Sequence, residues 1–211
     1  MKSKLMKTVL VASIFLVSLI IILGCTKLLI MNQQFYHSQF ANLGVYENIG
    51  SAADIALNNI FDFFNGYSEL NSELFGKDEI EHMYDVRNMI FNGNVVFYSL
   101  VCALIVFFVF FYLYKKDYIA ESLMYGSALA LAIIIVLFLA VLINFDAVFT
   151  GFHMVFFEDG TWVFPADSML KTLFPDEFFE NFFIHVAGYS VLISLVLFFC
   201  LAYYKTKKGK K

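Results

Sequence analysis

Four long apolar runs constrain most strongly what this chain can fold into. They cover residues 8–31, 95–114, 122–143 and 186–204. Each run approaches or exceeds the roughly 20 apolar residues that a helix needs to cross a bilayer, and none contains proline or has an ionisable residue near its centre. Only helices and closed barrels satisfy their backbone hydrogen bonds inside lipid. The sequence therefore predicts an all-α membrane protein with four transmembrane helices.

The distribution of charge predicts how these helices are oriented. Basic residues gather before the first run, between the second and third runs, and in the tail 205–211. The two longer connections, 32–94 and 144–185, hold only three basic residues but 16 of the 18 acidic residues and all four histidines. Because positively charged loops stay inside, we expect a multi-pass cell-membrane protein with both termini in the cytoplasm. The basic tail is expected to contact anionic lipid headgroups and not nucleic acid.

The first run also resembles a secretion signal, because a basic start and an apolar core lead to Ile22-Leu-Gly-Cys25. The apolar residues continue to Met31, however, which is longer than the core of a signal peptide. We therefore interpret the run as an uncleaved transmembrane helix. In the third run, Gly126 and Ala130 form a pair of small residues four positions apart, a spacing that lets membrane helices approach closely.

The two outer segments are predicted to form a helical cap. Ser51 as N-cap and the pair Asn65-Gly66 as terminator frame one helix, and a second short helix is predicted over 78–91. Helices of this kind often lie in the plane of the membrane interface. In the segment 144–185, phenylalanines recur at helical spacing and Asp159-Gly160 predicts a turn.

His82 is the first candidate for chemistry. On a helix, Asp85 lies three residues further on and faces the same side as His82. A carboxylate in that position can orient an imidazole and raise its basicity. The alternative is an ordinary surface histidine in an acidic amphipathic helix, and the local pattern alone favours this alternative.

His153 is the stronger candidate. It follows the third run by a few residues, and its helical neighbours are Phe149, Phe156 and Phe157. Burial beside aromatic rings lowers the pKa of a histidine and leaves a neutral base at pH 7. An interfacial histidine that fills an aromatic belt together with Trp162 is the equal alternative. His37 and His185 have no comparable carboxylate and carry no prediction.

Other chemistries find little support. No HExxH or similar arrangement predicts a metal site, and no GxSxG predicts a serine nucleophile. Two of the three cysteines, Cys102 and Cys200, lie within apolar runs, where a buried thiol is inert. The absence of ionisable residues from the middle of the runs is evidence against a pump, channel or coupled carrier.

The order of several short motifs resembles a known family. His82-Met-x-Asp85-Val86 precedes the second run, and His153-x-x-Phe156 is followed by Trp162, Asp167 and Leu173-Phe-Pro before the fourth. With the four-span layout, this resembles the lipoprotein intramolecular transacylase family of Gram-positive bacteria over essentially the whole chain.

The resemblance implies an acyltransferase that acts at the outer face of the membrane on diacylglyceryl lipoproteins. Such an enzyme moves the sn-2 acyl chain from the glycerol to the α-amino group of the same N-terminal cysteine. It implies no cofactor and no metal, and we expect a monomer whose partners are its lipoprotein substrate and membrane lipids. The implied catalytic pair is His153 and His82. To this pair we add two predictions of our own: supporting residues, Asp85 and Arg87, and substrate-binding residues, Trp162, Phe156 and Asp167.

Two alternatives stay open on the sequence. The chain could be a non-enzymatic membrane subunit whose cap binds a partner or lipid. It could also be a membrane hydrolase in which the same histidines activate water. In the first case, replacing His153 or His82 leaves function intact; in the second, the product is free fatty acid.

Overall fold

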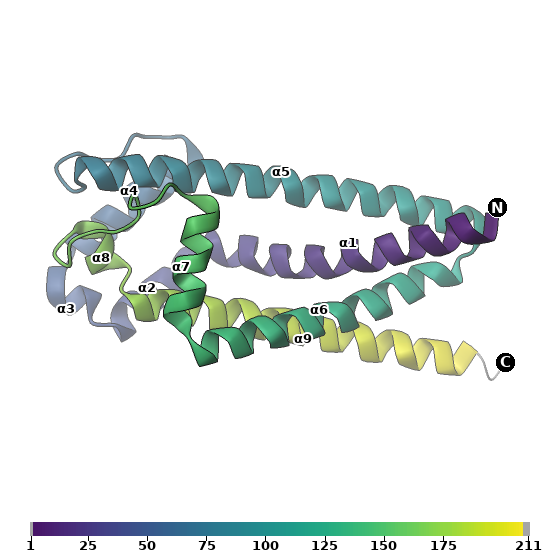
Figure 1. Ribbon diagram of the computed structural model, residues 1–211. Helices are drawn as coiled ribbons and strands as arrows, with labels where there is room; N and C mark the ends of the chain where they lie inside the picture. Colours follow the sequence, from purple (N-terminus) through teal and green to yellow (C-terminus); the bar gives the residue numbers. More distant parts are fainter. Residues whose placement is uncertain (1, 209–211) are drawn as a thin grey trace. The chain divides into compact units, whose positions relative to one another are not determined.

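The computed structural model describes residues 2–208, which are almost entirely helical and contain no strand (Figure 1). The helices of this part of the chain are α1 (Lys2–Ile30), α2 (Gln33–Asn42), α3 (Val45–Ile49), α4 (Ala52–Asn65), α5 (Lys77–Tyr114), α6 (Asp117–Ile143), α7 (Phe145–Phe156), α8 (Met169–Leu173) and α9 (Asp176–Lys208). Among them, α1, α5, α6 and α9 are long and apolar enough to cross a membrane. The prediction of an all-α protein with four membrane helices is confirmed.

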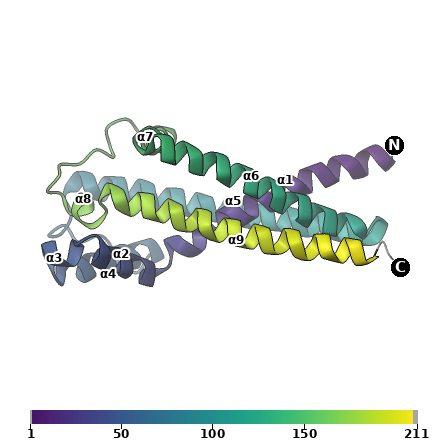
Figure 2. The same cartoon turned by 90° about the horizontal axis from the view of Figure 1, so that it is seen from below.

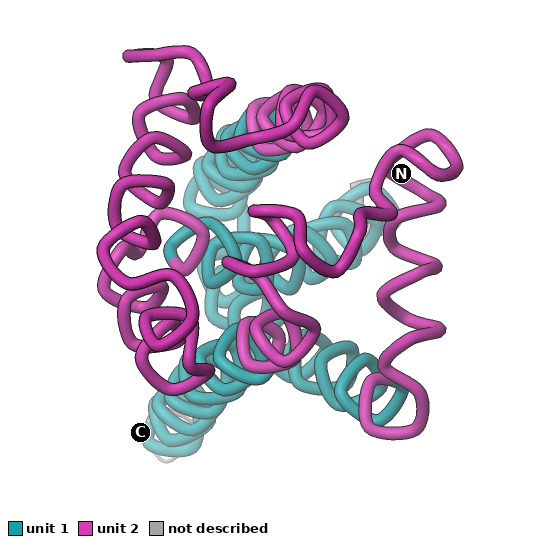
Figure 3. The backbone as a smooth tube through the Cα atoms, turned by 90° about the vertical axis from the view of Figure 1, so that its left-hand side faces the viewer, with its two compact units in different colours: residues 1–28, 93–140, 184–211 teal, residues 29–92, 141–183 magenta. Residues whose placement is uncertain are grey.

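The chain divides into two compact units, coloured separately in Figure 3. The described residues of unit 1 are 2–28, 93–140 and 184–208, and unit 2 consists of 29–92 and 141–183. Unit 1 therefore contains most of the predicted membrane-spanning residues. Unit 2 contains nearly all of the two segments that the sequence predicts to lie outside.

In unit 1, small residues of α6 let that helix pack closely against α1. A Cβ atom added to Gly126 in α6 would lie 2.5 Å from Cβ of Val17 and 3.0 Å from the carbonyl oxygen of Ile14, both in α1. Ala130, one turn further along, is fully buried against Val17 and Ile21. The predicted role of Gly126 and Ala130 in helix packing is confirmed, because only a residue without a side chain fits at position 126.

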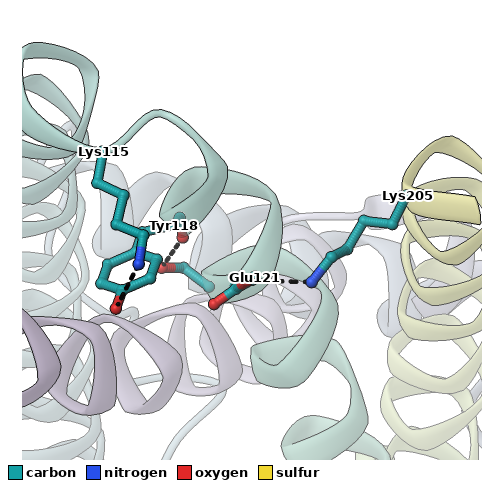
Figure 4. A network of polar contacts seen from close by, with 5 residues as sticks. Lys115, Tyr118, Glu121 and Lys205 are labelled. Atoms are coloured by element: carbon teal, nitrogen blue, oxygen red, sulfur yellow. Dashed lines mark hydrogen bonds and ion pairs between the residues drawn. The ribbon is translucent and has the colours of Figure 1, made fainter. Parts of the chain in front are cut away.

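Polar contacts gather at the end of unit 1 where the chain's first and last described residues and the α5–α6 connection lie (Figures 1 and 2). Lys205 of α9 forms an ion pair with Glu121 of α6, with 3.1 Å between Nζ and Oε1. Lys115 donates a hydrogen bond to the hydroxyl of Tyr118 at 3.1 Å (Figure 4). Basic groups that the sequence places near three separate run ends thus share one end of this unit.

Unit 2 is built around aromatic side chains. Phe40 and Phe63 are fully buried, and Phe35 and Tyr36 of α2 contact Phe178 at the start of α9, with ring centroids 5.7 and 5.3 Å apart. The predicted helix after Ser51 is α4, which ends where Gly66 adopts a left-handed conformation at φ 78°. Ser51 occupies the N-cap position, although its side chain makes no capping hydrogen bond.

One sequence expectation is wrong. The segment 78–91 is not a separate helix, because it forms the first part of α5, which continues without interruption to Tyr114. The sequence Asn92-Gly93-Asn94 looks like a helix terminator, but one glycine in a helix interior costs only about 1 kcal/mol. Such a cost is too small to end a helix with an apolar run on its C-terminal side. The side chains of 77–92 are therefore held at fixed angles along one rigid helix.

Candidate functional site

Unit 2 brings His82 and His153 together from α5 and α7. Their ring centroids are 6.4 Å apart, and the ring planes differ by 24°. Each histidine is only 8% exposed. Seventy residues separate the two in the sequence, so no local pattern could reveal this proximity.

A main-chain hydrogen bond fixes the protonation of His153. Its Nδ1 lies 2.8 Å from the carbonyl oxygen of Phe149, one turn earlier in α7. A carbonyl oxygen can only accept, so Nδ1 carries the proton and Nε2 keeps a free lone pair. The side chain of Asn144 caps the start of α7 by accepting from the backbone N–H of Ala147 at 2.9 Å. His153 is thus held as a base with Nε2 available.

Aromatic rings surround both imidazoles. Phe149 and Trp162 lie nearest to His153, with ring centroids 4.1 and 4.7 Å away. Phe157 contacts both histidines, at 4.8 Å from His82 and 5.4 Å from His153. The indole Nε1 of Trp162 is buried and, within the described residues, has no hydrogen-bond partner. The site therefore offers an unused donor beside a base.

This environment keeps both histidines neutral, and both lie outside the predicted membrane-spanning runs. The pKa of His82 is lowered to about 4, first by burial and then by nearby His153, while the negative charge of Asp85 partly opposes these two effects. Burial also lowers the pKa of His153, against the opposing effect of its hydrogen bond to Phe149. At pH 7 neither imidazole is charged, so both can accept protons.

A cavity of about 440 Å³ opens beside His82. One wall is the first turns of α5, with Asp78, Glu81, His82 and Asp85, and the other is the segment 156–164. This volume is within the range of small-molecule pockets. His82 reaches the cavity directly, whereas His153 is linked to it through the ring of Phe157, which lines the wall.

The remaining predicted residues are distributed unevenly around this cavity. Phe156 and Asp85 line it, and Trp162 lies against His153. Arg87 lies elsewhere, with its guanidinium 4.8 Å from the centroid of Phe63, and Asp167 is in an exposed turn outside the cavity lining. Within the described residues the buried Nδ1 of His82 has no hydrogen-bond partner, so Asp85 does not orient the ring through this atom.

The sequence did not point to Glu79, which lies outside the cavity lining and stabilises the helix that carries His82. This carboxylate is 6% exposed and accepts hydrogen bonds from the backbone N–H of Gly76 at 2.7 Å and of Leu170 at 2.6 Å. The first contact is half of a capping box at the start of α5, a spacing that the sequence does contain. The second joins α5 to the start of α8. Glu79 therefore fixes the helix that carries His82.

His37 has partners that the sequence did not predict. Its Nδ1 lies 2.7 Å from the hydroxyl of Tyr46 and 3.3 Å from a carboxylate oxygen of Asp54, and Tyr46 donates a hydrogen bond to Asp54 at 2.8 Å. Burial, together with this hydrogen bond, raises the pKa of Tyr46 to about 12. The cluster joins α2, α3 and α4 and does not line the cavity.

The chemistry available to the site is proton transfer beside aromatic rings. Among residues 2–208 there is no group of three or more histidine, cysteine, aspartate or glutamate side chains that could hold a metal ion. What the site does contain is a neutral base with a defined free nitrogen, a second neutral imidazole, and an unpartnered N–H donor.

Comparison with known proteins agrees with this fold. The family model described as lipoprotein intramolecular transacylase Lit matches residues 11–179. The solved structure of the membrane integral lipoprotein intramolecular transacylase Lit from Bacillus cereus is similar, with a TM-score of 0.88 and 17% identity over 99% of this chain and 100% of that one. A variant of it with a histidine replaced by alanine gives a TM-score of 0.84 and 16% identity, over 100% of this chain and 98% of that one. No curated protein matches the chain in a sequence comparison.

Proposed function

Because the chain belongs to the lipoprotein intramolecular transacylase family and is thus an acyltransferase, we propose that it moves the sn-2 acyl chain of a diacylglyceryl-cysteine lipoprotein to the α-amino group of the same cysteine. An amide bond forms to the acyl carbon, and the ester bond to the glycerol oxygen breaks. The product is an N-acylated lyso-lipoprotein of unchanged mass. Donor and acceptor belong to one molecule, so the reaction needs no second substrate.

The hydrogen bond between Nδ1 of His153 and the Phe149 carbonyl is the observation that carries this proposal. It leaves Nε2 free to take a proton from the attacking nitrogen. Nε2 of His153 then gives that proton to the departing glycerol oxygen, so that His153 is neutral before and after the reaction. A positioned base and acid of this kind contributes about 10²–10⁴-fold to a rate.

Trp162 and His82 complete the proposed site. When the amine attacks, the ester carbonyl oxygen becomes negative, and a preorganised N–H donor stabilises that charge. The indole N–H of Trp162 is buried, unpartnered within the described residues, and belongs to a ring 4.7 Å from His153. His82, whose pKa is also lowered, assists proton movement on the cavity side.

The aromatic walls account for transfer to the amine in preference to hydrolysis. Phe149, Phe152, Phe157 and Trp162 all have ring centroids within 5.5 Å of His153. A site enclosed by such rings holds ester and amine together, which supplies much of the acceleration, and leaves little room for water. We also propose that the site faces the outside of the membrane and that both termini face the cytoplasm, as the charge distribution predicts.

The test uses purified full-length protein and a synthetic diacylglyceryl-cysteinyl peptide. Tandem mass spectrometry should show one acyl group moving from glycerol to nitrogen at constant total mass. The variant His153→Asn keeps an amide donor for the Phe149 carbonyl but has no base at the position of Nε2. We expect its rate to fall by about 10³-fold, with the melting temperature within about 2 °C of the wild type.

Two results would contradict the proposal. An unmodified peptide after incubation with folded wild-type protein would exclude transacylation of this substrate and favour a binding subunit. Free fatty acid together with lyso-peptide carrying an unmodified amine would instead show that water is the acceptor.

A further inference from the structure

We propose that Glu79 is a positioning residue for the reaction: by holding the backbone N–H of Leu170, its carboxylate keeps the indole of Trp162 against His153. The inference rests on the proposed function. It goes beyond the support that Glu79 gives to α5, because it assigns to the same carboxylate the position of a second part of the site. That part is residues 157–168, which join α7 to α8 and are named here the covering segment.

The covering segment packs against both histidines through three aromatic rings. The ring centroids of Phe157 and Phe164 lie 4.8 and 5.4 Å from that of His82. The centroid of Trp162 lies 4.7 Å from that of His153. These three side chains are half-buried, whereas the residues between them are exposed. The rings are therefore the part of the segment that contacts the site.

The hydrogen bonds of the covering segment hold it to itself and to α7. Three backbone bonds close turns within it, from Thr161 to Glu158, from Val163 to Gly160 and from Ser168 to Pro165, at 3.2, 3.4 and 3.0 Å. At its start, the N–H of Phe157 donates to the carbonyl of His153 at 2.8 Å, which ties it to α7. Because the middle of the segment makes only local bonds, its position relative to α5 depends strongly on what holds its other end.

Glu79 holds that other end. Among the described residues, the only hydrogen bond that joins the covering segment or α8 to α5 is donated by the backbone N–H of Leu170 to Oε1 of Glu79, at 2.6 Å. Both residues are only 6% exposed, so water cannot easily replace the carboxylate. Leu170 lies two residues after the covering segment, and Glu79 lies one turn before His82. The carboxylate thus connects the helix of His82 to the segment that carries Trp162.

Loss of the carboxylate should displace the covering segment. A buried N–H without an acceptor is costly, so the start of α8 would move to where water reaches the N–H of Leu170. Local opening of this kind leaves the rest of a fold intact. Trp162 would no longer be held against His153, and its N–H would no longer point at the developing oxyanion. A misplacement of about 1 Å at a reacting group can cost about 10²-fold in rate.

The first measurement follows Trp162 without substrate. It is the only tryptophan of the chain, so acrylamide quenching of the fluorescence of the full-length protein reports how well the covering segment shields it. Glu79→Ala removes both acceptor oxygens and should raise the quenching constant about threefold. Glu79→Gln keeps one acceptor oxygen and should raise it less.

Two control variants should leave the quenching constant unchanged. Glu73→Gln neutralises an exposed carboxylate between α4 and α5. Gly126→Ala destabilises the packing of α6 against α1 in unit 1. The second control separates displacement of the covering segment from a general loss of stability.

The second measurement asks whether Glu79 acts through Trp162. On the ester peptide, Glu79→Ala should lower kcat about tenfold and change KM less than about threefold. The double variant Glu79→Ala/Trp162→Phe should be as slow as Trp162→Phe alone, within about twofold, because a residue that only positions the indole has no effect once the indole is gone.

An unchanged quenching constant in Glu79→Ala that is folded by circular dichroism would overturn the inference, as would effects on kcat that multiply in the double variant. If Glu79→Ala does not fold, Glu79→Gln replaces it in both measurements and the same outcomes decide. Because quenching requires no substrate, failure of the wild type to convert the ester peptide would remove the proposed function and leave the displacement of the covering segment as a separate result.

Discussion

Among the described residues, the buried polar side chains of unit 1 are all serines, whereas those of unit 2 are Gln39, Glu79, His82 and His153. A serine in a membrane helix can return its hydrogen bond to its own helix, as Ser13 and Ser18 do to the carbonyls three residues earlier, at 2.7 and 2.9 Å. Such groups are inexpensive to bury and carry no charge. Burying the polar groups of unit 2 costs more.

The two units also differ in which of their buried polar atoms lack a hydrogen-bond partner. In unit 1, the hydroxyls of Ser190 and Ser194 have no partner within the described residues, but a hydroxyl can rotate toward a carbonyl of its own helix. In unit 2, the unpartnered atoms are nitrogens of rigid rings, in His82 and Trp162. A ring nitrogen that packing holds in place cannot find another partner easily. The polar groups of unit 1 are thus compatible with simple helix packing, whereas those of unit 2 form the proposed site.

The largest effect after loss of His153 should come from Trp162→Phe. Phenylalanine keeps the aromatic packing against His153 but removes the only N–H of the indole. We expect kcat to fall about 30-fold, in the lower range for loss of an oxyanion donor, with KM changed less than threefold. Steady-state kinetics on the ester peptide measure this. An unchanged kcat would mean that the unpartnered nitrogen of unit 2 has no more function than the serine hydroxyls of unit 1.

A packing change in unit 1 should affect stability and not chemistry. Gly126→Ala places a Cβ atom 2.5 Å from Cβ of Val17, and overpacking of this kind costs about 1–3 kcal/mol. We expect the melting temperature in detergent to fall by about 5 °C, while the rate per folded molecule stays within twofold. Gly188→Ala in α9 is the matched control, because a Cβ there has no atom within 4 Å. Equal melting temperatures for the two variants would refute the close contact.

The smallest effect concerns acid stability. The folded-state pKa of His82, about 4, lies below the value near 6.5 of an unfolded chain. Between these pH values the unfolded chain binds a proton that the folded chain does not, so acidification destabilises the fold. From about pH 7 to pH 4.5, the melting temperature of the wild type should fall about 2–4 °C more than that of His82→Asn. Parallel curves for the two proteins would show that His82 titrates normally in unit 2.

The sequence was sufficient for the fold class and for the small-residue contact at Gly126, because run length and residue size are local properties. The two histidines could be singled out by their neighbours. Their proximity could not, since it depends on how α7 packs against α5. The two hydrogen bonds of Glu79 could not be predicted together. The one from Gly76 is local, but the one from Leu170 joins residues that are 91 positions apart.

The predicted end of a separate helix at residue 91 shows the opposite error. The segment Asn92-Gly93-Asn94 lies between the helix predicted over 78–91 and the second apolar run. The apolar residues on the C-terminal side of it outweigh the cost of one glycine, and α5 continues. As a result the helix that carries His82 is continuous with the second membrane helix.

The acceptor that sets the tautomer of His153 belongs to the main chain of residue 149. In a triad the corresponding acceptor is a carboxylate side chain, and one point mutation can delete it. Here any residue that keeps α7 helical supplies the same carbonyl, so substitution at position 149 can alter the packing around the imidazole without removing its orienting bond. The tautomer of His153 therefore tolerates substitutions nearby. Replacing the aromatic residues around the imidazole can change the shape of the site while the hydrogen bond that orients His153 is kept.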